Sequence, residues 1–262
     1  MSADPSTPSS DVPGATPEAA GRPPAVLQVL PALVTGGVER GTVEIAQALV
    51  KAGWRAVVAS AGGAMVREIE RAGGTHITLP LKTKNPFGIR RNIRHLADLI
   101  ERENIDLVHA RSRAPAWSAY FAAKRTGRPF MTTFHNVYGG KGRLKRWYNS
   151  VMARGARVIA ISQFVGRAAA KTYGVGPDRL RVIPRGVDLT RFDPETVHPS
   201  RLVQLATEWQ LKDGLPVVML PGRVTRWKAM SICCMPPSAC PIAISSWCSS
   251  ATTSRSRRFA TN

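Results

Sequence analysis

Three short groups of residues have the types and spacing that could bind or transform an anionic ligand. Gly36-Gly37 comes directly before an amphipathic run, and a glycine pair there would let a phosphate approach backbone N–H groups at a helix N-terminus. Arg111 and Arg113 follow a short apolar run, where two guanidinium groups could hold a phosphate or carboxylate. His135-Asn136 ends another apolar run. Each group also has a purely structural explanation. The glycine pair could form a tight turn without a ligand, the two arginines could lie in a solvated loop, and the histidine could be structural.

A fourth group combines positive charge with an aromatic side chain. It consists of Lys141, Arg143, Lys145, Arg146 and Trp147. Basic residues beside an interfacial aromatic are typical of a helix that lies on an anionic membrane surface. A solvated basic helix is the plain alternative, and RNA binding is a third, although no nucleic-acid-binding motif is visible.

The composition indicates a globular chain with an anionic partner. The chain has 262 residues, 44% of them hydrophobic, which is enough for one large domain or two small ones. Its formal charge of +20 points to nucleic acid, membrane phospholipid or a phosphorylated substrate without choosing among them. No run reaches the roughly 18 apolar residues of a membrane span, and the N-terminus lacks a secretory pattern. All four cysteines lie after residue 232, which favours a reducing, cytoplasmic location.

Short apolar runs alternate with longer amphipathic runs over most of the chain. This alternation predicts an α/β fold, with a Rossmann-like parallel sheet and helices on both faces. The predicted strands are 25–30, 56–59, 76–79, 105–109, 130–134, 158–161 and 182–183. The clearest predicted helices are 38–52, 65–72 and 89–103. The three candidate groups follow strand ends, where ligands bind in open α/β sheets.

The composition also divides the chain into segments. Residues 1–24 are rich in Pro, Ser, Ala and Thr, so we expect a disordered leader. Residues 25–185 would form the first domain, and 186–199 are polar and typical of a linker. Residues 200–228 would open a second domain, with a short helix near 200–210 and a strand at 216–220.

Several of these segments, in this order, resemble family 4 of the glycosyltransferases. The similar segments are Gly36–Arg40, Thr132–His135, Ala160–Ser162, Val182–Asp188 with Arg191-Phe192, and Pro221–Arg223 with Lys228. The segment Val182–Asp188 is the most specific of them, because it matches the family's interdomain segment closely. The resemblance covers residues 25–228. It implies a GT-B fold, here an acceptor-side N-terminal domain followed by the start of a donor-binding domain.

The resemblance implies a donor site for a UDP- or GDP-sugar. Gly36 and Gly37 would approach the donor phosphates through the backbone, while Arg223 and Lys228 would hold the pyrophosphate. His135 would lie near the transferred sugar as the catalytic residue. Family members retain the anomeric configuration and usually need neither a metal nor a cofactor, so stabilisation of the departing diphosphate would be the main catalytic task.

The same resemblance implies an acceptor from the cell envelope, either a glycan or a lipid-linked sugar. We assign Arg111, Arg113 and Asn136 to an anionic acceptor. The enzyme would then work at the cytoplasmic face of the membrane. A GT-B nucleotide-sugar epimerase and a non-catalytic basic module that binds membrane or RNA are the alternative hypotheses.

The last 34 residues are expected to be an out-of-frame tail. Ala229 stands where the family has glycine, and no Asp, Glu or Lys occurs after Lys228. One nucleotide restored after codon 228 can give Lys-Gly-His-Val-Asp and then a plausible next βα unit. A genuine metal-binding tail is the alternative, although Cys233, Cys234, Cys240 and Cys248 lack paired C-x-x-C spacing. We therefore expect a truncated chain that transfers sugar poorly alone.

Overall fold

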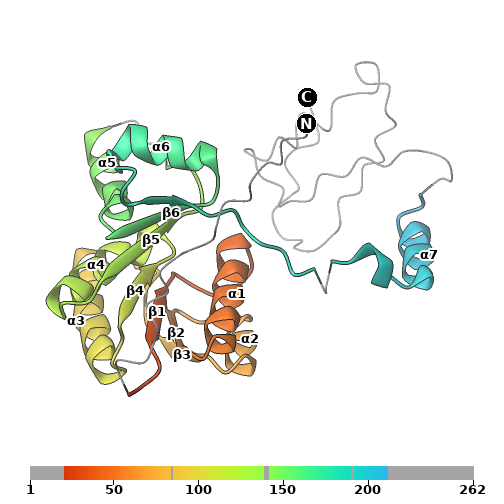
Figure 1. Ribbon diagram of the computed structural model, residues 1–262, viewed down its shortest axis with the longest axis horizontal. Helices are drawn as coiled ribbons and strands as arrows, with labels where there is room; N and C mark the ends of the chain where they lie inside the picture. The colour runs from red at the N-terminus through yellow and green to blue at the C-terminus, as the bar shows by residue number, and fades with distance from the viewer. Residues whose placement is uncertain (1–20, 84, 139–141, 190–191, 212–262) are drawn as a thin grey trace, which may run out of the picture. The chain divides into compact units, whose positions relative to one another are not determined.

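The computed structural model describes residues 21–83, 85–138, 142–189 and 192–211 (Figure 1). The chain divides into two compact units, Met1–Gly186 and Val187–Asn262. The predicted site residues from Gly36 to Trp147 all belong to the first unit.

The first unit contains one sheet of seven parallel strands in the order β3-β2-β1-β4-β5-β6-β7. The strands are β1 (Ala25–Val29), β2 (Arg55–Ser60), β3 (Thr75–Thr78), β4 (Leu107–Ala110), β5 (Phe130–Phe134), β6 (Arg157–Ala160) and β7 (Leu180–Val182). Every neighbouring pair is parallel. The α/β class and the Rossmann-like parallel sheet predicted from the sequence are confirmed.

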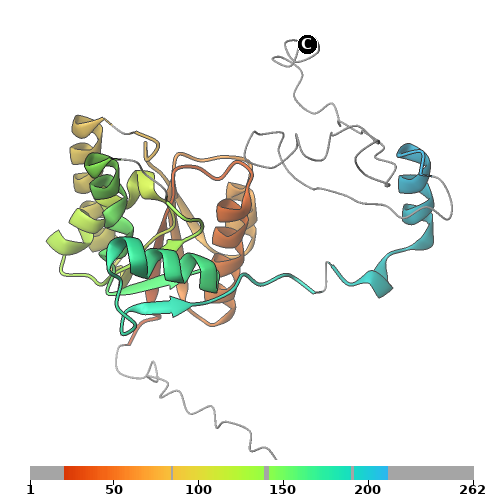
Figure 2. The ribbon, with the colours of Figure 1, turned by 90° about the horizontal axis from the view of Figure 1, so that it is seen from above.

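Helices cover both faces of this sheet. They are α1 (Gly37–Lys51), α2 (Val66–Arg71), α3 (Pro86–Arg102), α4 (Arg113–Arg125), α5 (Arg143–Asn149), the 3-10 helix η2 (Ser150–Ala153) and α6 (Gln163–Tyr173). Helices α1 and α2 lie on one side of the sheet, and α3 and α4 lie on the other (Figures 1 and 2).

The alternation of side chains along β2 explains the two layers. Val57 and Ala59 belong to the larger apolar core, together with residues of α3, α4 and α6. Ala56 and Val58 belong to a smaller core that they share with residues of α1 and α2. A parallel strand that is buried on both faces reads as a continuous apolar run, which is the pattern of this strand in the sequence.

Two strands differ from their predicted bounds. Strand β4 begins at Leu107 because the Ile105 N–H still bonds to the Ile100 carbonyl and belongs to the turn that ends α3. Strand β7 spans Leu180–Val182, earlier than the predicted 182–183. It pairs with β6, and Pro184, which lacks an N–H, follows soon after its end.

Residues 21–24 are held against the first unit, although the sequence assigned them to a leader. The Arg22 guanidinium donates to both carboxylate oxygens of Asp106, at 2.9 and 2.7 Å. The Pro24 carbonyl accepts from the Arg55 N–H at 2.8 Å. The folded part of the chain therefore begins before Ala25.

The second unit is described only in part. It contains the 3-10 helix η3 (Pro194–Thr196) and helix α7 (Pro199–Glu208). Helix α7 confirms the helix predicted near residues 200–210. The predicted strand at 216–220, the rest of the second domain and the tail lie outside the described residues. In the described part of the chain, no helix is both long enough and apolar enough to cross a membrane.

Candidate functional site

The candidate residues gather at the carboxyl edge of the sheet, where the strand order reverses direction. Strands β1 and β4 are neighbours in the sheet but not in the sequence, and β5 follows β4. The loop after β1 leads to Gly36, the turn after β4 carries Arg111, and β5 runs into His135. The Arg111 N–H donates to the Val29 carbonyl at 2.9 Å, which fixes the turn beside β1. Such a switch point is the usual ligand-binding position in this class of sheet.

The N-terminus of α1 has backbone N–H groups that could bind an anion. Gly36 is the N-cap residue, with a φ of 148° that favours glycine, and no side chain caps the helix. The free N–H groups of the first turn and the positive end of the helix dipole attract negative charge. The Glu39 carboxylate lies here, because a Cβ added to Gly36 would meet its Oε2 atom at 2.5 Å. A bound phosphate at this turn would have to displace that carboxylate.

Two arginines from distant parts of the sequence converge on the same face of α1. A Cβ added to Gly41 would lie 2.8 Å from Nη2 of Arg185 and 3.0 Å from Nη2 of Arg111. A Cβ added to Gly37, one turn earlier, would lie 3.0 Å from Nη1 of Arg185. The absence of side chains at these two glycines therefore leaves the space that the guanidinium groups use.

Within the described ranges, the two guanidinium groups have little negative charge to balance them. Arg111 is only 5% exposed, and its Nε has no hydrogen-bond partner within the described residues. Burial, and then the charge of Arg185, lower the pKa of Arg111 to about 10, while Glu44 acts in the opposite direction. Glu44 is an ion-pair partner of Arg185 at 4.0 Å. Arg111 still carries its proton at neutral pH, so the cluster is a cationic site at the sheet edge.

His135 faces the same cluster as a neutral imidazole. Burial, followed by the charges of Arg111 and Arg185, lowers the pKa of His135 to about 3. Both ring nitrogens are buried without a hydrogen-bond partner in the part of the chain that the structure describes. A neutral imidazole has one N–H donor and one acceptor, so its N–H can bind a phosphate or hydroxyl oxygen while its other nitrogen can accept from a substrate hydroxyl.

A second histidine lies beneath this site. His109 on β4 is 3% exposed, and its Nε2 lies 2.8 Å from the Thr133 hydroxyl on β5. Burial, then Arg111 and His135, hold the pKa of His109 well below its usual value. His109 is therefore a neutral, hydrogen-bonded support between two strands, and the pattern of the sequence did not single it out.

Two of the predicted acceptor residues do not join the cluster around Gly41. The Arg113 Nη1 donates to the Asn149 side-chain oxygen at 3.0 Å, and its guanidinium carbon lies 4.3 Å from the centre of the Tyr138 ring. Asn136 is exposed, and its side-chain oxygen accepts from the Val137 N–H at 2.8 Å. Each of these side chains is engaged locally. The predicted donor residues Arg223 and Lys228 lie outside the described residues.

The predicted membrane group lies mainly on helix α5. Arg143, Lys145 and Arg146 are exposed, and Lys141 lies outside the described residues. Trp147 is 56% exposed and stacks on Trp117 of α4, with ring centres 4.8 Å apart. Leu144 is 78% exposed on the same helix. The structure thus places basic, aromatic and aliphatic side chains on one short exposed helix.

Three members of the cationic site were not predicted as functional residues: Gly41, Glu44 and Arg185. Arg185 does lie within the Val182–Asp188 segment that resembles the family's interdomain segment. Gly41 follows Gly37 by four residues, so the two glycines share one helix face. This four-residue spacing of glycines could have indicated, from the sequence, that other groups approach this face of α1 closely.

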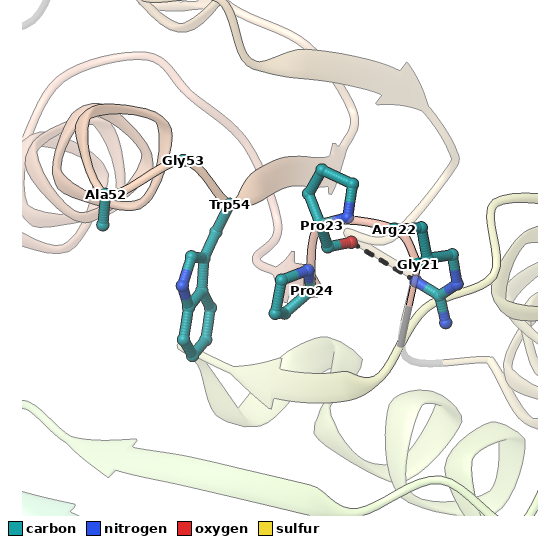
Figure 3. A pocket seen from close by; sticks show the side chains of 7 residues that line it. All are labelled: Gly21, Arg22, Pro23, Pro24, Ala52, Gly53 and Trp54. Atoms are coloured by element: carbon teal, nitrogen blue, oxygen red, sulfur yellow. Dashed lines mark hydrogen bonds between the residues drawn. The ribbon is translucent and has the colours of Figure 1, made fainter. Parts of the chain in front are cut away.

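A hollow at the other edge of the sheet does not belong to this site. It has a volume of about 280 Å³ and is lined by Gly21, Arg22, Pro23, Pro24, Ala52, Gly53 and Trp54 (Figure 3). These residues lie at the amino ends of β1 and β2. The carboxyl ends of the strands, which carry the cationic cluster, are at the opposite edge.

The sequence and the fold both match known glycosyltransferases. The sequence model described as Glycosyltransferase Family 4 matches residues 35–191. A solved glycosyltransferase from Rickettsia africae ESF-5 is 40% identical with a TM-score of 0.70, over 80% of this chain and 55% of that chain. D-inositol 3-phosphate glycosyltransferase of Nocardia farcinica is 32% identical over 82 residues, which are 31% of this chain and 17% of that protein.

A more distant structure shares the fold alone. Anabaena Alr3699/HepE in complex with UDP-glucose is 19% identical with a TM-score of 0.57, over 71% of this chain and 50% of that chain. The present chain thus spans about half the length of these solved structures.

Proposed function

The chain belongs to glycosyltransferase family 4, and from this premise we propose that it is the acceptor-side half of a nucleotide-sugar-dependent transferase. The observation that carries the proposal is the convergence of Gly37, Arg111, Arg185 and His135 at the switch point of the sheet. The helix N-terminus at Gly36-Gly37 suits the donor diphosphate, whose charge grows on the leaving group during transfer, and the adjacent arginine pair suits an anionic acceptor.

The proposed donor is a UDP- or GDP-sugar, bound without a metal or cofactor. Gly36 and Gly37 would offer backbone N–H groups to its phosphates, with Arg223 and Lys228 holding the pyrophosphate. In the transfer, the bond between the anomeric carbon and the diphosphate oxygen breaks, and the nucleoside diphosphate leaves with the electron pair. The acceptor hydroxyl oxygen would form the new bond with retained configuration, and its proton would pass to an oxygen of the departing diphosphate. The UDP-glucose bound in the Anabaena structure supports this class of donor.

The neutral state of His135 suits a role beside the transferred sugar. Its pKa of about 3 keeps the ring uncharged at pH 7, so it can donate one hydrogen bond and accept another. The proposed acceptor is an envelope glycan or lipid-linked sugar with a negative group near Arg111. Arg113 and Asn136 would contribute only if they leave their present partners.

The decisive experiment compares two proteins. One is the 262-residue chain, and the other is encoded by the same gene with one nucleotide restored after codon 228. Each is mixed with UDP- and GDP-sugars and with envelope lipid extract, and nucleotide release and sugar incorporation are measured. We expect incorporation by the restored protein and little or none by the 262-residue chain.

Each alternative hypothesis predicts another result of this comparison. Isomerised nucleotide sugar without incorporation would identify an epimerase and overturn the proposed transfer. Rapid incorporation by the 262-residue chain would contradict the proposal that it is only half of the catalytic unit. Resequencing the DNA around codon 228 tests the out-of-frame tail directly.

We also propose that α5 attaches the protein to the cytoplasmic face of the membrane. Each basic residue near an anionic surface contributes about 1 kcal/mol to binding, so the double change Lys145→Gln with Arg146→Gln should weaken binding roughly 30-fold. Co-sedimentation with phosphatidylglycerol vesicles at fixed salt measures this. The matched control is Arg167→Gln with Lys171→Gln on the exposed side of α6. Equal losses in both double variants would show binding by net charge alone, and binding of RNA but not vesicles would favour the basic-module hypothesis.

A further inference from the structure

The arrangement around Gly41 provides more positive charge than the described residues balance. Arg111 comes from the turn after β4, and Arg185 comes from the segment after β7, yet both guanidinium groups approach Gly41 on α1. Like charges at such short range repel in a partly buried environment. A negative group placed between the two guanidinium groups would offset this repulsion and stabilise both segments.

The acidic side chains nearby do not fill this role. Glu44 reaches Arg185 only at 4.0 Å, the outer limit of an ion pair. Glu39 lies beside Gly36, at the start of α1. Arg111 is nine-tenths buried, and its Nε has no partner in the described part of the chain. An unpaired donor on a buried guanidinium is costly unless a ligand completes its hydrogen bonds.

We propose that Arg111 and Arg185, whose guanidinium groups both lie against Gly41 of α1, form a subsite for a phosphate monoester. Two guanidinium groups match the oxygens of a phosphate in pairs, and the lack of a side chain at Gly41 lets both guanidinium groups approach the helix. The adjacent His135 ring offers a further donor through its buried nitrogen. The phosphate lies within the first unit and needs no contribution from the donor-binding half.

The subsite belongs to the acceptor, an assignment that rests on the proposed function. The donor diphosphate has its own proposed partners, which are the backbone at Gly36-Gly37 and the side chains of Arg223 and Lys228. Arg111 and Arg185 are therefore available for a phosphate on the acceptor molecule. The proposed acceptor is therefore a phosphorylated sugar, or a glycan that carries a phosphate monoester close to the reacting hydroxyl.

The test uses the complete 262-residue chain with inorganic phosphate and glycerol 3-phosphate as probes. Binding is measured by calorimetry at constant ionic strength, and the His135 ring signals are followed by NMR as each probe is added. We expect saturable binding of both probes and a rise in the pKa of His135, because a bound anion offsets the charges of Arg111 and Arg185. Arg185→Gln should weaken binding about tenfold or more, as expected for loss of a charge-assisted pair.

Two further variants keep the test decisive. Gly41→Ala should also weaken binding, since its Cβ would displace both guanidinium groups. Arg167→Gln removes one positive charge from the exposed side of α6 and should leave affinity unchanged within about twofold. Arg185 is one-third exposed, so its replacement should not unfold the chain, and circular dichroism checks this. Equal weakening by Arg185→Gln and Arg167→Gln would show non-specific attraction to a basic protein and overturn the subsite.

Addition of UDP separates the acceptor assignment from the donor. If UDP leaves phosphate bound, the subsite is not a nucleotide-diphosphate site, and the acceptor assignment is supported. If UDP displaces phosphate from the wild-type chain, the subsite serves the donor and the acceptor assignment is overturned, while the proposed transferase function stands. If the restored protein transfers no sugar while the 262-residue chain still binds phosphate, the proposed function is overturned and the phosphate subsite stands.

Discussion

Gly63→Ala is expected to destabilise the first unit by about 3 kcal/mol or more, through a steric clash added to backbone strain. A Cβ at Gly63 would lie 2.2 Å from the Leu33 carbonyl oxygen and 2.8 Å from the Val34 nitrogen, and the residue has a φ of +145°. The obstructing atoms belong to the backbone, so no side-chain rotation can relieve the contact. Urea unfolding followed by circular dichroism measures the loss.

Gly53→Ala is the matched control for this prediction. Gly53 also has a positive φ, of +77°, but a Cβ there would meet nothing within 4 Å. Only the strain of the left-handed backbone remains, at about 1 kcal/mol. Equal losses in the two variants would show that the approach of the two loops near Leu33 does not exist in solution.

The close approach at Gly63 bears on function because it holds together the two loops that follow β1 and β2. The Leu33 N–H donates to the Gly62 carbonyl at 2.9 Å, and the Leu33 carbonyl accepts from the Met65 N–H at 3.0 Å. The loop that is held in this way leads directly to Gly36-Gly37 at the start of α1. Gly63→Ala should therefore also disturb the anion-binding edge.

Lowering the pH from 7 to 5 is expected to destabilise the first unit by at least about 2 kcal/mol. The pKa of His135 is about 3 in the folded chain and about 6.5 when unfolded, so between these values the unfolded chain binds the extra proton. The stabilisation is complete above the unfolded pKa and is lost as the pH falls through the window toward 3. Burial and the neighbouring charges also lower the pKa of His109, which adds to the effect in the same direction.

His135→Gln isolates the contribution of one ring. This variant should lose about 2 kcal/mol less than the wild type between pH 7 and 5, measured as the free energy of unfolding in urea at each pH. His198→Gln, at an exposed position before α7, is the control and should follow the wild type. Unchanged pH dependence in His135→Gln would contradict the buried, neutral ring. Measurements stop at pH 5 because the Arg22 contact lowers the pKa of Asp106, whose titration becomes important only in stronger acid.

The linear pattern was sufficient to predict the fold class and most of its elements. Apolar runs alternate with amphipathic ones because a strand that is buried on both faces must be apolar throughout, whereas a covering helix needs one apolar face. The same logic located Gly36-Gly37, Arg111 and His135 at strand ends. The Val182–Asp188 segment identified the family, which the match over residues 35–191 confirms.

Only the tertiary structure decided which of these residues act together. Arg111 and Arg185 are 74 positions apart in the numbering, and they meet because β1 lies beside β4 while the segment after β7 returns to α1. Arg113, two residues after Arg111, turns instead to Asn149 and Tyr138. Sequence periodicity reports which face of an element is apolar, but strand order and helix packing determine which side chains converge. Arg185 therefore could not be joined to Arg111 from the sequence alone, before the strand order was known.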